Sequence, residues 1–147
     1  MTIAELSRVY ELKREIDWYD KRIDELRAQR TAISAPAFDK EPGQRGDPSR
    51  SKIETLTAEI IDLEELLRLH RQQIVIEHAR LERYVATVDD PQVRQIMHLR
   101  YADLQSWSDV ASAMHYSVEA VKKRLYRYLE KHPDDRPAEG QKTEQIG

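Results

Sequence analysis

Residues 106–131 read SWSDVASAMHYSVEAVKKRLYRYLEK, and this stretch decides the fold of the C-terminal half of the chain. Ser106 and Ser117 each precede an apolar-periodic segment, and serine is a favoured residue at a helix N-terminus. The inward positions are Val110, Ala111 and Met114 in the first segment, and Val118, Val121, Leu125 and Tyr128 or Leu129 in the second. The stretch therefore predicts two short helices joined by a tight turn, the helix-turn-helix arrangement.

A third helix is predicted just before this pair. Asp90 is a good N-cap and Pro91 suits a first helical turn, so a helix should begin there. Its inward face would be Val93, Ile96, Met97 and Tyr101. Residues 89–131 are therefore predicted to form one compact helical module.

Charge is distributed unevenly along the chain. The whole chain has a net charge of -3, whereas residues 91–131 contain seven bases and four acids, a balance of +3. Residues 53–90 contain four bases and nine acids, a balance of -5. The predicted module is thus basic beside an acidic segment, a pattern that favours a local nucleic-acid surface, although any amphipathic helix also needs a polar outer face.

The polar face of helix 118–131 suggests how DNA would be read. With Val121 inside, base readout is assigned to Glu119, Lys122, Lys123 and Arg127, since acidic and basic side chains accept from cytosine and donate to guanine in the major groove. Phosphate contacts are assigned to Arg100, Ser106, Ser117 and Arg124. Trp107 is expected to be a packing anchor, and Tyr126 to contact sugar, thymine methyl or only solvent.

The N-terminal half has two long helical patterns. Apolar residues recur at alternating spacings of three and four at Val9, Leu12, Ile16, Tyr19, Ile23, Leu26 and Ile33, and again at Ile53, Leu56, Ile60, Leu63, Leu67, Ile74, Leu81, Tyr84 and Val88. Such narrow stripes are typical of coiled-coil packing. Three Pro and two Gly at 34–51 predict a loop between one helix over 1–35 and a second of nearly 40 residues. Residues 1–88 should therefore form a long antiparallel helical hairpin.

Polar residues interrupt both stripes at Arg30, His70 and Glu77. Polar stripe positions commonly set register or oligomeric state, and two thin stripes bury little surface, so we expect a homodimer. His70 and His78 lie eight residues apart, about 12 Å along a helix axis, which is too far to share one metal ion.

Composition narrows the function classes. The chain lacks cysteine, so it has no thiol nucleophile or thiolate metal site. No apolar run reaches about 18 residues, and the start of the chain lacks the order of a signal peptide, so we expect no membrane association and a cytoplasmic location. No phosphate loop, carboxylate pair or activated nucleophile is visible. We therefore expect a non-enzymatic protein without cofactor or metal.

Residues 99–129 resemble region 4 of bacterial sigma factors, through Arg100-Tyr101 before a loop, the Ser106-Trp107 helix start and the segment SVEAVKKRL at 117–125. Together with the stretch 33–52 and the motif EIIDLEELL at 59–67, residues 10–131 resemble small phage and prophage proteins with an N-terminal helical hairpin and a sigma-like helix-turn-helix. The resemblance implies a sequence-specific regulator of transcription that binds double-stranded DNA in the cytoplasm of a bacterial host. The position of the turn that is usually glycine in region 4 is His115 here, so we expect a positive φ or a shifted turn at this residue.

Two other functions fit the same features. A helix-turn-helix joined to an oligomerising hairpin would also serve as a phage DNA-packaging recognition subunit, similar to a small terminase, and a sigma-like module could act as an adaptor that contacts host RNA polymerase. A dimer would favour regulation and a ring of eight or more would favour packaging.

Residues 132–147 contain two Pro and more acids than bases, so we expect a disordered tail.

Overall fold

The fold consists of helices and their connections. The computed structural model describes residues 1–35 and 48–133, and every regular element in these ranges is helical, which confirms the all-α prediction. The elements are α1 (Ile3–Leu6), α2 (Arg8–Ser34), α3 (Pro48–Ala86), α4 (Pro91–Met97), the π-helix η1 (His98–Ala102), α5 (Trp107–Met114) and α6 (Val118–Lys131). The predicted tail from residue 134 and the loop residues 36–47 lie outside the described residues.

The chain divides into two compact units. The first, here called the helix-pair unit, comprises residues 12–74; the second, the multi-helix unit, comprises residues 1–11 and the described residues from Val75 onward. The predicted domain boundary between residues 88 and 89 falls inside the multi-helix unit, where Val85 and Val88 are buried.

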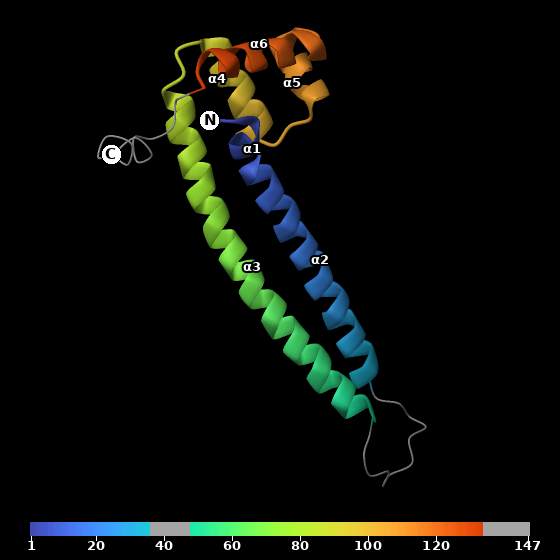
Figure 1. The fold of residues 1–147 in the computed structure, drawn as a ribbon. Helices are drawn as coiled ribbons and strands as arrows, with labels where there is room; N and C mark the ends of the chain where they lie inside the picture. The colour runs from blue at the N-terminus through green and yellow to red at the C-terminus, as the bar shows by residue number, and fades with distance from the viewer. Residues whose placement is uncertain (36–47, 134–147) are drawn as a thin grey trace, which may run out of the picture. The chain divides into compact units, whose positions relative to one another are not determined.

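In the helix-pair unit, α2 and α3 lie side by side and run antiparallel (Figure 1). As the residue numbers rise along α2, those of the facing residues of α3 fall: Arg71 Nη2 lies 3.1 Å from Asp20 Oδ1, and Arg27 Nη2 lies 2.6 Å from Glu64 Oε1. Between the helices, the apolar stripes form a core whose buried members are Ile16, Ile23, Leu26, Ile60 and Leu67. Exposed ion pairs contribute little free energy, so burial of this core holds the pair together.

Two of the polar stripe residues, Arg30 and His70, have partners across the helix pair. Arg30 donates to the Thr57 hydroxyl at 3.3 Å. His70 lies with Nε2 2.6 Å from Glu15 Oε2, and its Nδ1 lies 2.7 Å from the Leu66 carbonyl oxygen. These contacts match only one alignment of α2 with α3, so they favour a single register.

Three helix boundaries differ from those predicted. The first predicted helix is broken at Ser7, because a complete capping box between Thr2 and Glu5 starts α1 and the Ser7 hydroxyl bonds back to the Ile3 carbonyl. The predicted loop 34–51 is shorter at both ends. Ser34 still belongs to α2, and α3 begins at Pro48, because proline is tolerated at the first position of a helix. With 39 residues, α3 has the predicted length.

The multi-helix unit has its own apolar core. The predicted inward residues Val93, Ile96, Met97 and Tyr101 are all buried, as are Val110, Ala111 and Met114 of α5 and Val121 and Leu125 of α6. Leu6 of α1 is also fully buried. No helix in the described ranges has a stretch both long and apolar enough to span a bilayer.

Candidate nucleic-acid interface

The segment from α5 to α6 has the predicted capped geometry. The Ser106 hydroxyl accepts the Asp109 amide N–H at 3.1 Å, and the Ser117 hydroxyl accepts the Ala120 amide N–H at 3.1 Å. Between the helices, His115 has φ 60° and ψ 35°, the left-handed conformation expected for this turn. The turn is closed by a hydrogen bond from the Tyr116 amide to the Ala111 carbonyl at 3.1 Å.

The buried side of α6 fixes which residues face outward. Val121 and Leu125 are buried at 2% and 0% exposure, against α5 residues such as Val110, which is also at 0%. Since successive residues turn by about 100° on a helix, this places four of the polar side chains on the opposite side. The structure leaves exposed Glu119, Lys123, Tyr126 and Arg127. These four residues are called the outer face of α6 below.

Lys122 lies apart from the outer face. It is partly buried, and its Nζ lies 5.5 Å from the centroid of the Trp107 ring. The sequence placed Lys122 at the edge of the reading surface with Lys123 and Arg127, but the structure brings it to the flank that faces α5. Of the four residues predicted to read bases, three share the outer face.

Trp107 forms the centre of a cluster that the sequence did not reveal. The guanidinium of Arg100 lies 4.9 Å from the Trp107 ring centroid and 5.8 Å from that of Tyr10, and Lys122 approaches Trp107 as described above. The Tyr101 ring meets Trp107 edge-on at 6.3 Å, and burial raises the pKa of Tyr101 to about 12. Trp107 thus both packs and holds two cations, each contact worth about 0.5–1 kcal/mol when exposed.

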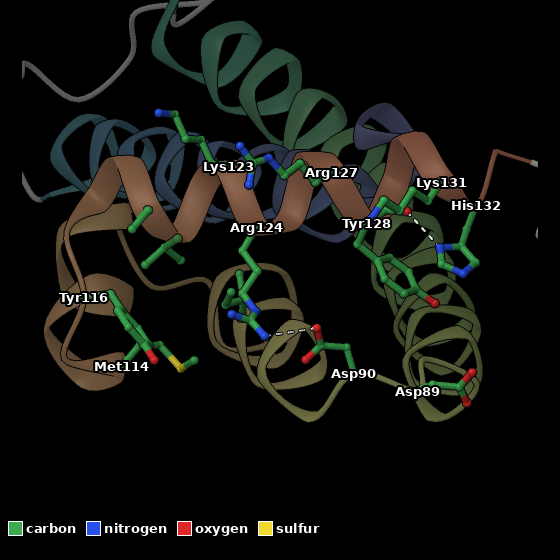
Figure 2. Close-up of a pocket in the computed structure, with 13 residues that line it drawn as sticks. Asp89, Asp90, Met114, Tyr116, Lys123, Arg124, Arg127, Tyr128, Lys131 and His132 are labelled. Atoms are coloured by element: carbon green, nitrogen blue, oxygen red, sulfur yellow. Dashed lines mark hydrogen bonds and ion pairs between the residues drawn. The ribbon is translucent and has the colours of Figure 1, made fainter.

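The residues predicted to contact DNA phosphates differ in the protein contacts that their side chains already make. Arg100 donates to the Gln105 carbonyl at 2.8 Å, in addition to its aromatic contacts. Ser106 and Ser117 are exposed, and each hydroxyl oxygen accepts a backbone N–H. Each hydroxyl can therefore still donate its own proton to a phosphate oxygen. Arg124 points from α6 toward the start of α4, where it pairs with Asp90 at 3.3 Å (Figure 2). The Trp107–Arg100 contact had no sequence signal, because η1 interrupts the regular helix spacing between them.

His70 and His78 have protein partners, and the described residues contain no group of three or more potential metal-ligating side chains. His70 belongs to the helix-pair unit and contacts Glu15. His78 belongs to the multi-helix unit and lies 3.4 Å from Glu82.

Comparisons of the chain with protein-family models, with curated proteins and with solved structures found no match.

Proposed function

We propose that the chain is a sequence-specific DNA-binding regulator of transcription, of the phage sigma-like type, in which α5 and α6 act as a helix-turn-helix. The observation that carries the proposal is the outer face of α6: Lys123 and Arg127 project from a helix whose other side is anchored by Val121 and Leu125. A rigid helix with an exposed cationic face fits the major groove. Its action would be that of a binding protein in a bacterial cytoplasm, without catalysis.

In this proposal, the outer face reads bases and its flanks hold phosphates. Lys123 and Arg127 would donate to guanine O6 and N7, and Glu119 would accept from cytosine N4, each worth about 1–3 kcal/mol of discrimination. Ser106, Ser117 and Arg124 would contact phosphates, since they are exposed near helix starts or at the side of α6. Lys122 and Arg100 would support this surface through Trp107.

One recognition helix buries too little surface for a typical specific site, so the proposal includes a homodimer formed by the helix-pair unit as a coiled-coil hairpin. Four large apolar side chains of this unit are exposed: Trp18, Ile61, Leu66 and Leu69. On α3, Ile61 and Leu69 lie on the side away from the buried residues Ile60 and Leu67. A second copy that covers them would supply two reading helices for two half-sites. Contact with RNA polymerase stays a prediction.

The test is selection of bound duplexes from a randomised DNA library with the full chain. We expect enrichment of one sequence class, with binding that weakens steeply as salt rises. The variant Lys123→Ala plus Arg127→Ala should abolish the enrichment, because both side chains are assigned to base edges. The matched control is Lys21→Ala plus Lys52→Ala, which removes the same charge from exposed positions of the helix-pair unit.

Two outcomes would contradict the proposal. Equal enrichment by wild type and the Lys123/Arg127 variant would show that the outer face of α6 does not read DNA. An equal loss in the Lys21/Lys52 control would show that overall charge, rather than this face, governs binding.

A further inference from the structure

A cavity of about 690 Å³ lies beside α6, within the multi-helix unit. Its walls come from the start of α4, the end of α5 with its turn, and the flank and end of α6 (Figure 2). This volume falls in the range of about 300–1,000 Å³ found for small-molecule sites. The cavity is therefore large enough for a ligand, and three of its lining residues, Lys123, Arg124 and Arg127, also have roles in the proposed DNA contacts.

The cavity combines an apolar part with an excess of positive charge. Ile96, Met114, Ala120 and Val121 line it, together with the ring of Tyr116, which is 50% exposed. The charged lining residues are Lys123, Arg124, Arg127 and Lys131 against Asp89 and Asp90, with His132 beside them. Four cations against two carboxylates leave a balance of +2 with the histidine neutral.

The apolar and charged lining of the cavity defines the ligand more closely than the volume of the cavity does. A DNA backbone would match the positive charge but leave the apolar lining and the exposed Tyr116 ring in water. A neutral apolar molecule would match the lining but leave the four cations without a partner beyond Asp89 and Asp90. We propose that this cavity is a binding site for a small organic dianion with an aromatic or other apolar body.

Arg124 is the central residue of the proposed site. Figure 2 shows its side chain reaching from α6 toward Asp90, between Tyr116 and Met114 on one side and Tyr128 on the other. Its guanidinium has five donors, and the only contact shown for it in the described structure is Asp90 at 3.3 Å. A ligand anion would therefore bind Arg124 beside Asp90 or in its place, while its apolar body lies against Met114 and Tyr116.

The site also has a consequence for DNA, which rests on the proposed function. Lys123 and Arg127 belong both to the cavity lining and to the outer face of α6. A ligand that engages them competes with DNA, and thermodynamic reciprocity requires that DNA lower the affinity for the ligand by the same factor. The dianion would act as an effector that releases the regulator from DNA.

The first experiment measures ligand binding without DNA. The probe is 2-naphthyl phosphate, a dianion at about pH 7.5, titrated into the full chain and followed by methyl NMR signals of Met114 and Ile96. We expect saturable binding about tenfold tighter than that of inorganic phosphate or of 2-naphthol, because each of these supplies only half of the interaction.

Two variants, each with a matched control, test whether the probe binds in the cavity. Ala120→Phe fills the cavity from an exposed helix position and should weaken binding about tenfold, whereas the matched variant Ala113→Phe, at an exposed position of α5 outside the lining, should not change it. Arg124→Gln tests the same site without added bulk and should also weaken binding about tenfold, against Arg83→Gln as the charge control.

Three results would overturn the proposal. The first is unchanged probe binding in both Ala120→Phe and Arg124→Gln. The second is an affinity for inorganic phosphate equal to that for the probe. The third is binding of an acidic peptide with one Phe between two Asp residues that is tighter than binding of the probe, which would assign the site to a protein partner. A second arm adds the probe to the DNA complex and expects release of DNA. If the chain binds no DNA, the proposed function fails while the first experiment still decides whether the cavity binds the dianion.

Discussion

Asp90 and Arg124 join the start of α4 to the middle of α6. Arg124 Nη2 lies 3.3 Å from Asp90 Oδ2, while Oδ1 of the same carboxylate accepts the amide N–H groups of Gln92 at 2.9 Å and Val93 at 3.3 Å. One carboxylate therefore caps a helix and also positions an arginine of the proposed DNA-binding helix. Both roles can be separated by mutation.

Replacing Asp90 should destabilise the multi-helix unit mainly through loss of the cap. We expect Asp90→Ala to lower the free energy of unfolding by about 1 kcal/mol, and Asp90→Asn to cost less because asparagine caps as well as aspartate. The exposed ion pair with Arg124 adds little. Urea denaturation measures both, and Asp89→Ala is the matched control. A loss in the control equal to that of Asp90→Ala would contradict the assignment of the cap.

Protonation of the Asp90 carboxylate should make the free energy of unfolding depend on pH, and the direction of its pKa shift fixes the sign. Burial alone would raise the pKa of Asp90, but the hydrogen bonds from Val93 and Gln92 and the Arg124 guanidinium together lower it below its usual 3.8. A lowered folded-state pKa means that the stabilisation is fully present above about pH 3.8 and is lost as the pH falls through the folded-state pKa. The difference in unfolding free energy between wild type and Asp90→Ala should therefore be constant near neutral pH and shrink below pH 3.8.

His115 holds a conformation that costs free energy for a residue with a Cβ atom. At φ 60°, glycine has no steric penalty, so His115→Gly should stabilise the chain by about 0.5–1 kcal/mol, and His115→Val should destabilise it by more than 1 kcal/mol. Thermal denaturation measures both changes. If Gly and Val had the same effect, the left-handed turn would not be the constraint at this position.

The sequence predicted the helices of this structure far better than it predicted their irregular connections. Stripe residues such as Ile23 and Leu67 and cap residues such as Asp90 and Ser117 act through local spacing, which a sequence displays directly. Leu104 adopts φ 57° without any local signal in the sequence, because leucine disfavours that region of backbone conformation. The position of Lys122 against Trp107 likewise depends on tertiary structure.

The two tryptophans should respond differently to removal. Trp18 is 57% exposed, whereas Trp107 is half-buried between Arg100 and Lys122. We expect Trp107→Ala to cost about 1–3 kcal/mol and Trp18→Ala to cost about 0.5 kcal/mol or less, since burial scales with apolar area. In variants in which Phe replaces the other tryptophan, the fluorescence emission maximum of Trp107 should lie at a shorter wavelength than that of Trp18. The reverse order would contradict the Trp107 cluster.

The proposed dimer can be tested through the exposed side of α3. Ile61→Glu plus Leu69→Glu should convert the dimer to a monomer, because four like charges would face one another across the contact. Sedimentation equilibrium measures the mass. Ser51→Glu plus Thr55→Glu adds the same charge at exposed polar positions and should leave the dimer intact. A monomeric wild type would exclude this dimer, and a ring of eight or more would favour DNA packaging over regulation.

The π-helix gives the chain one residue more than an α-helical turn requires. The Asp103 amide bonds to the His98 carbonyl, five residues back, at 2.8 Å, instead of to the residue four back. Deletion of a single residue between His98 and Ala102 would let the turn close as an ordinary α-helix with its hydrogen bonds intact. The segment between α4 and α5 can therefore gain or lose one residue at η1 without breaking the helix.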